Sequence, residues 1–142
     1  MTFTVANIDH VGIRVTDRAA AQLFYEKLGF VFDPEEDSPQ GSAIGLVNAA
    51  GARINLIYNG IASRGGNVLL DLPEKWPGYT HAAFIVDDLD SLVDWLGREG
   101  VAITEGPSIF GKGRRKVCFI RDPDGNVIEF DEILRDDLAE RG

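Results

Sequence analysis

This chain has very little cysteine and no long apolar run, and each absence excludes a class of protein. The 142 residues include one cysteine, so no internal disulfide framework can form, which is typical of a reducing compartment. No apolar run approaches the roughly 18 residues that a membrane-spanning helix needs. The N-terminal residues have neither the basic start nor the apolar core of a signal peptide. We therefore expect a cytoplasmic protein with no membrane partner.

Basic residues are scarce relative to acidic ones. The chain has 14 Lys and Arg against 23 Asp and Glu, which gives a net charge of -9 and a pI near 4.6. Such a surface repels phosphate backbones, so we expect no nucleic-acid partner. The length and the hydrophobic content of 44% suit one compact domain with a real core, spanning residues 1–142.

Histidine is also rare, and the two that are present occupy equivalent places in an internal repeat. The segments that begin at His10 and His81 share valine five residues on, aspartate seven residues on, an aromatic residue fourteen on and glycine nineteen on. A duplicated unit relates its copies by a pseudo-twofold axis, so equivalent residues can face each other across that axis. Two histidines placed in this way, beside an inward carboxylate, are what a divalent metal requires.

The first copy of the repeat reads as β-α-β-β-β. Residues 8–15 alternate as a strand. Thr16 or Asp17 can cap a helix that runs to about residue 28, with Gly29 ending it. We expect the buried stripe of this helix to consist of Leu23, Phe24 and Leu28. Further strands are expected at residues 42–47 and 53–58.

The second copy repeats this order. Residues 81–86 form a strand, and Asp87 with Asp90 resembles a capping box at the start of the next helix. The buried stripe of this helix is expected to consist of Leu92, Trp95 and Leu96. Strands follow at residues 116–121 and 126–133, joined by the strong turn signal Asp-Pro-Asp-Gly.

These patterns predict an α+β fold of two βαβββ modules. Module 1 covers about residues 7–60 and module 2 about residues 79–134, with a linker at 61–78 rich in Gly and Pro. The charged tail at 135–142 is expected to be a short surface helix or a frayed end.

Strand alternation gathers a set of candidate ligands on the faces turned away from the helices. His10 and His81 lie opposite the apolar stripes of their strands, and Glu129 lies opposite Ile128 and Phe130. Asn55 is the repeat partner of Glu129. Two imidazoles and one carboxylate with open positions suit one divalent ion per site, with Fe, Mn, Zn, Ni and Co as candidates.

Four segments of this chain resemble the vicinal oxygen chelate superfamily, which includes glyoxalase I, fosfomycin-resistance enzymes, extradiol dioxygenases and bleomycin-binding proteins. The resemblance covers nearly the whole chain and is carried by IDHV at 8–11, FYEKLGF at 24–30, His81, and FIRDPDGNVIEF at 119–130. It implies paired modules that form an incomplete mixed barrel around a central metal-binding cavity, usually in a homodimer. It also implies His10, His81 and Glu129 as the metal ligands.

The chain departs from each characterised branch of that superfamily. Glyoxalase I enzymes have a glutamate that takes part in proton transfer where this chain has Asn55, and an amide does not take up a proton near neutral pH. Asp131, on the same strand face as Glu129, is then the candidate base. No third histidine matches the extra catalytic histidine of extradiol dioxygenases, and Gly12 replaces a threonine of the fosfomycin-resistance enzymes.

The resulting expectation is a metal-dependent enzyme that acts on a small substrate with vicinal oxygens. The reaction would be of the lyase or isomerase class, or a thiol or epoxide addition. An anionic substrate group would be bound by basic side chains near the cavity, namely Arg14, Arg53, Lys112 and Arg114. Two alternatives stay open: a non-catalytic protein that sequesters a small molecule such as bleomycin, and an extradiol-type dioxygenase. A site within one chain and a site shared across a swapped dimer are equally compatible with the sequence.

Overall fold

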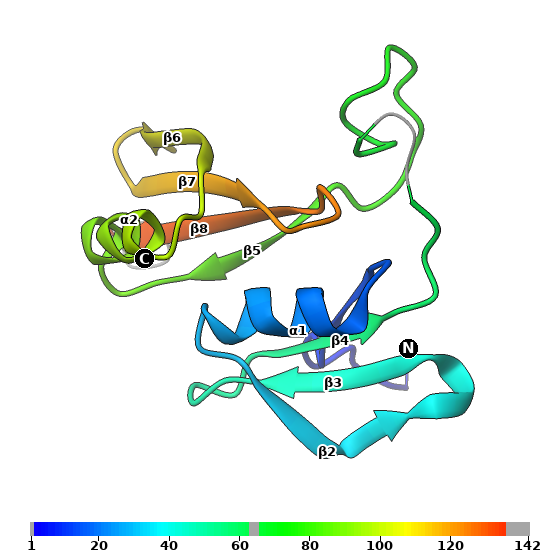
Figure 1. Cartoon of the computed structure of the whole chain (residues 1–142). Coiled ribbons are helices and arrows are strands. Elements are labelled where there is room, and N and C mark those ends of the chain that lie inside the picture. The colour runs from blue at the N-terminus through cyan, green and yellow to red at the C-terminus, as the bar shows by residue number, and fades with distance from the viewer. Residues whose placement is uncertain (1, 63–65, 136–142) are drawn as a thin grey trace. The chain divides into compact units, whose positions relative to one another are not determined.

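The computed structural model describes residues 2–62 and 66–135, and over this range the chain is α+β (Figure 1). It divides into two compact units, residues 1–62 and 63–142, which repeat the same order of elements. The predicted α+β fold of two βαβββ modules is therefore confirmed. The predicted tail lies, after Arg135, outside the described residues. No helix of the described part is long and apolar enough to cross a membrane.

The first unit is a mixed four-stranded sheet with one α-helix. Its strand order is β1-β4-β3-β2, in which β1 and β4 are parallel and the other neighbours are antiparallel. The elements are β1 (Val11–Arg14), α1 (Arg18–Glu26), β2 (Val31–Ser38), the 3-10 turn η1 (Pro39–Gly41), β3 (Ala43–Val47) and β4 (Arg53–Ile57).

The second unit has the same topology. Its strand order is β5-β8-β7-β6, again with the first pair parallel and the others antiparallel. The elements are β5 (His81–Ile85), α2 (Leu89–Arg98), β6 (Ile103–Phe110), β7 (Arg115–Arg121) and β8 (Val127–Ile133).

Aspartate caps start both helices. The side chain of Asp17 accepts a hydrogen bond of 2.9 Å from the backbone N–H of Ala20, as expected for one of the two predicted caps. The predicted capping box of Asp87 and Asp90 is wrong by one residue. Asp88 is the N-cap and accepts from the backbone N–H of Ser91, because its extended backbone directs the carboxylate at the first turn.

A buried core lies between each sheet and its helix. The fully buried side chains of the first unit include Tyr25, Ile44, Leu46, Ile54 and Leu56, and those of the second include Leu89, Leu96, Cys118, Ile120 and Ile128. These residues alternate along the strands, so the opposite faces of both sheets are left for polar side chains. Burial also raises the pKa of the Cys118 thiol, which makes it a structural residue.

The predicted helix stripes are partly wrong. Leu23 is 58% exposed and Trp95 is 41% exposed. In α1 the buried residues are Ala21 and Tyr25, which are four positions apart and therefore share one face. That phase turns Leu23 away from the sheet. In α2 the buried pair is Leu89 and Leu96.

The Asp-Pro-Asp-Gly turn between β7 and β8 is organised by one buried carboxylate. Asp122 is 5% exposed, and its Oδ1 accepts from the backbone N–H groups of Asp124 and Asn126, each at 2.9 Å. Its Oδ2 accepts from the side chain of Asn126. Gly125 follows at φ 83°, a conformation that L side chains rarely adopt. This turn sets the register of β8, which carries Glu129.

Replacement of Asp122 by alanine should therefore destabilise the protein by about 2–3 kcal/mol, because buried donors lose their acceptor. Chemical denaturation measures this change. Asp94→Ala, on the exposed face of α2, is the control and should change stability by no more than about 0.5 kcal/mol. Equal stability of the two variants would contradict the structural role of Asp122.

Candidate metal centre and adjoining pocket

His81 and Glu129 meet on the face of the second sheet that is turned away from α2. His81 is the first residue of β5, and Glu129 is the third residue of the adjacent parallel strand β8, in register with Ala83. His81 Nε2 is 3.2 Å from Glu129 Oε1. Both side chains are partly shielded, with 37% and 17% of their surfaces exposed. The structure thus brings together one imidazole and one carboxylate of the predicted ligand set.

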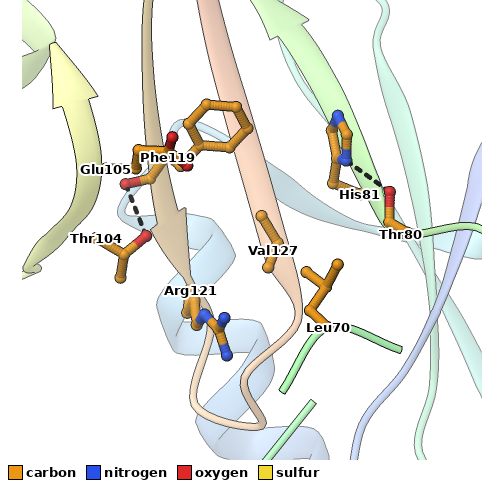
Figure 2. A pocket seen from close by; sticks show the side chains of 8 residues that line it. All are labelled: Leu70, Thr80, His81, Thr104, Glu105, Phe119, Arg121 and Val127. Carbon is orange, nitrogen blue, oxygen red and sulfur yellow. Dashed lines mark hydrogen bonds between the residues drawn. The ribbon is translucent and has the colours of Figure 1, made fainter. Parts of the chain in front are cut away.

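The orientation of the His81 ring is fixed by its surroundings. Its Nδ1 lies 2.8 Å from the Thr80 hydroxyl, as Figure 2 shows. The Phe119 ring packs edge-on against it, with centroids 5.8 Å apart. These two contacts hold Nε2 toward Glu129, which is the kind of support that ligating histidines require.

A second carboxylate lies beside Glu129 on the same strand. Asp131 is 6% exposed, and its Oδ2 is 3.3 Å from Nη1 of Arg115. Its Oδ1 is buried and accepts no hydrogen bond from any described residue. Burial, followed by the neighbouring Asp131 carboxylate, raises the pKa of Glu129 to about 7, against a lowering contribution from Arg115.

This arrangement fits a cation. Glu129 contacts an imidazole nitrogen, and the shielded Asp131 carboxylate, with its unsatisfied buried oxygen, lies two residues further on the same strand face. Arg115 offsets only part of the charge of the two carboxylates. Imidazole and carboxylate are donors that divalent transition metals accept. Among the described residues, no three His, Cys, Asp or Glu side chains gather into a ready metal site.

In the first unit, His10 and Asn55 lie at the positions that the repeat assigns to them. His10 directly precedes β1, and its Nδ1 is 2.7 Å from Asp9 Oδ2. Asn55 is the central residue of β4 and is half-buried. The buried neighbours Ile54 and Leu56 point to the helix side, so Asn55 lies on the opposite face, as the alternation predicts.

A pocket of about 310 Å³ adjoins His81 in the second unit (Figure 2). It contains hydroxyl, carboxylate and guanidinium groups over an apolar base, and its lining residues are Leu70, Thr80, His81, Thr104, Glu105, Phe119, Arg121 and Val127. The Arg121 guanidinium binds the Asp71 carboxylate through two contacts of 2.6 and 2.9 Å. This pairing holds the pKa of Asp71 down at about 2.

The basic residues expected to contact substrate lie elsewhere. Arg14 donates to Asn59, and Arg53 pairs with Asp33 at 3.2 Å. Lys112 and Arg114 lie in the β6–β7 turn, where Arg114 donates to the carbonyl of Gly111. Their role as substrate contacts stays a prediction. Sequence reasoning missed Arg121, although its alternation with Phe119 on β7 was a usable signal.

The raised pKa of Glu129 predicts a pH-dependent stability in chelator-treated protein. Below about pH 4.5 the residue is protonated in both folded and unfolded states, and its burial is not opposed. Between about pH 4.5 and 7 the unfolded chain releases this proton while the folded state retains it, so stability falls by an amount on the order of 2 kcal/mol and levels off above about pH 7. Denaturation at about pH 5 and pH 8 measures this loss. In Glu129→Gln the loss should be much smaller, and an identical pH dependence in the two proteins would refute the assignment.

This chain consists of two βαβββ units, and a histidine lies at or just before the first strand of each. It is therefore a protein of the paired-module class. The family model described as Glyoxalase/Bleomycin resistance protein/Dioxygenase superfamily matches residues 7–130. The chain belongs to this superfamily.

Relatives with names and structures agree with this placement. The chain is 26% identical over 129 residues to a probable lactoylglutathione lyase from Synechocystis, covering 84% of this chain and 90% of that protein. A glyoxalase/dioxygenase structure from Nostoc punctiforme matches with a TM-score of 0.72 at 20% identity, over 95% of this chain and 99% of that chain. An antibiotic-binding protein from Streptomyces matches with a TM-score of 0.68 at 22% identity, over 92% and 98%. The two structural matches are evidence of the fold alone.

Proposed function

We propose that this protein is a divalent-metal-dependent enzyme of the glyoxalase group that acts on a small substrate with two vicinal oxygens. The observation that carries the proposal is the contact between His81 Nε2 and Glu129 Oε1, beside an unsatisfied buried oxygen of Asp131 and next to a pocket of about 310 Å³. The proposed ligands are His10, His81 and Glu129. The bound metal would polarise the substrate oxygens and stabilise negative charge that develops on them.

The side chains of this site would then have different roles in metal binding and proton transfer. His81 and Glu129 would bind the metal from the second unit, and His10, the repeat counterpart of His81, would complete the set. Asn55 offers a neutral oxygen to the metal or the substrate but cannot take up a proton. Asp131 is assigned the proton transfer, because it is the carboxylate nearest along β8 and the Arg115 guanidinium holds it in place.

The proposed reaction is a lyase or isomerase step, or a thiol or epoxide addition. Relatives named lactoylglutathione lyase support the lyase assignment at the level of the group. The amide at position 55 gives no support to the lactoylglutathione substrate itself. The pocket beside His81 would hold the part of the substrate that does not react.

His81→Ala should remove the metal and leave the fold intact. Elemental analysis of protein purified without a histidine tag should give close to one divalent ion per chain in the wild type and much less in the variant. Circular dichroism reports whether the fold is kept, and Lys75→Ala is a control on the same unit. Full metal occupancy in His81→Ala would reject the ligand assignment.

Metal binding, ligand stabilisation and O₂ consumption distinguish the two alternative functions, which are sequestration of a small molecule and extradiol-type oxygenation. A wild-type protein that binds no added metal, yet is stabilised by a small molecule such as bleomycin, would be a sequestering protein. An iron-loaded protein that consumes O₂ in the presence of a catechol would be an extradiol-type dioxygenase.

We also propose a homodimer. Several apolar side chains near the N-terminus are well exposed, including Phe3 at 65%, Val5 at 82% and Ile8 at 77%. Exposed apolar surface of this kind is commonly covered by a second chain. Sedimentation velocity at micromolar concentration should therefore give about twice the chain mass of 15.5 kDa. A stable monomer at that concentration would contradict the proposal.

A further inference from the structure

Asn55 lies between two glycines on the face that is turned away from α1. Its register partner on β1 is Gly12, and its register partner on β3 is Gly45. Neither neighbour has a side chain. The missing side chains leave a space on each side of the Asn55 amide, and Ile57 Cδ1 borders the one at Gly12, 3.5 Å from the place of a Cβ atom. The opposite face of the sheet is packed with large apolar side chains.

One of these two spaces is filled by Glu36 from β2. A Cβ atom placed on Gly45 would lie 2.4 Å from Glu36 Cβ and 3.1 Å from its Cγ. The same point is 3.5 Å from the amide oxygen Oδ1 of Asn55. Glu36 and Asn55 therefore approach the same spot on the same face. Only glycine at position 45 lets them do so, because packed protein atoms do not come as close as 2.4 Å.

The irregular course of β2 brings Glu36 to this place. The pairing of β2 with β3 is regular from Val31 to Asp33 and resumes only at Ser38. Asp33 is the register partner of Gly45, yet Glu36, three residues later, covers the same glycine. Irregularities of this kind re-aim side chains and are frequent beside active sites.

No hydrogen bond or ion pair with a described residue explains the position of Glu36. Asp33, its neighbour on β2, pairs with Arg53 at 3.2 Å. Glu36 is exposed and makes no hydrogen bond or ion pair with any described residue. Glu36 Cγ and the Asn55 amide oxygen both lie near the place of a Cβ atom on Gly45. A carboxylate and an amide oxygen are hard oxygen donors, which suit a divalent cation.

We propose that Glu36 is a further metal-binding residue, which adds to the candidate centre the negative charge that Asn55 lacks. This inference rests on the proposed function, because it takes His10 and Asn55 to lie at the metal. In this arrangement the first unit contributes a carboxylate through its β2 irregularity, whereas the second unit contributes Glu129 from β8.

Titration of chelator-stripped, full-length protein with Zn²⁺ and with Mn²⁺ tests the inference. Glu36→Gln keeps the size of the side chain and removes its charge, and it should weaken metal binding by about tenfold or more. Glu35→Gln removes the same charge from the adjacent residue and should stay within about twofold of the wild type, since screening weakens an exposed charge that does not touch the metal. The rise in melting temperature on adding metal is a second readout and should shrink only for Glu36→Gln.

Gly45→Ala provides an independent variant. Its Cβ would occupy the place of the Glu36 side chain and force β2 to move, so metal binding should weaken as in Glu36→Gln. In the double variant the two losses should not add, because both remove the same contribution. Additive losses would contradict the inference.

The failures of the two proposals are distinguishable. If Glu36→Gln binds metal like the wild type while His81→Ala does not bind it, only the role of Glu36 is refuted. If the wild type binds neither ion, the metal-dependent function and the role of Glu36 are both refuted.

Discussion

The contact between His81 and Glu129 depends on one constraint, which is that each sheet buries a single face. α2 covers the side of its sheet that carries Ile120 and Ile128, so the intervening residues of β5 and β8 must point to the other side. Because β5 and β8 are adjacent and parallel, the imidazole and the carboxylate reach each other across one strand spacing. Asp131 and the pocket beside Phe119 lie on this helix-averted face or at its margin.

The two units share their topology but not their chemistry. In the second unit Glu129 contacts the histidine, and burial together with the neighbouring Asp131 raises the pKa of Glu129, which creates a site that a cation would stabilise. The first unit has an amide at the equivalent strand position, with glycines on both sides of it. The charge that a divalent ion needs from this unit would come from a different strand, through Glu36. The two units thus have the same arrangement of strands and helix, but the candidate metal-binding atoms at their equivalent positions differ.

The features that the sequence predicts well are local or periodic. The repeat, the two modules, the Asp17 cap and the turn before β8 follow from spacing and turn chemistry, and strand alternation correctly assigns Asn55 and Glu129 to the helix-averted faces. The errors have local causes. Asp87 and Asp88 are equally good caps by composition, and only the backbone geometry selects Asp88. The predicted stripe of α1 is wrong because the small residue Ala21 lies on the buried face of the helix, whereas Leu23 is exposed.

Two features of the site could not be predicted from the sequence because they depend on contacts between distant segments. The Asp71–Arg121 pair joins the segment before β5 to the end of β7, which are fifty positions apart. The approach of Glu36 to Asn55 depends on an irregularity in β2. Pro34 marks the place where the ladder is interrupted, but neither it nor Gly45 shows which side chain covers the glycine. At such a close approach, a glycine within a strand indicates that another segment lies next to it, which the composition alone does not show.

The proposed function rests on one central claim, which is that His10 and His81 would bind one metal together with Glu129. X-ray absorption spectroscopy of the metal-loaded wild-type protein tests it most directly, because the scattering of imidazole rings is distinguishable from that of simple oxygen ligands. The account predicts two imidazole nitrogens and additional oxygen donors at about 2.0–2.2 Å from the metal. A first coordination shell with one imidazole or none would contradict it.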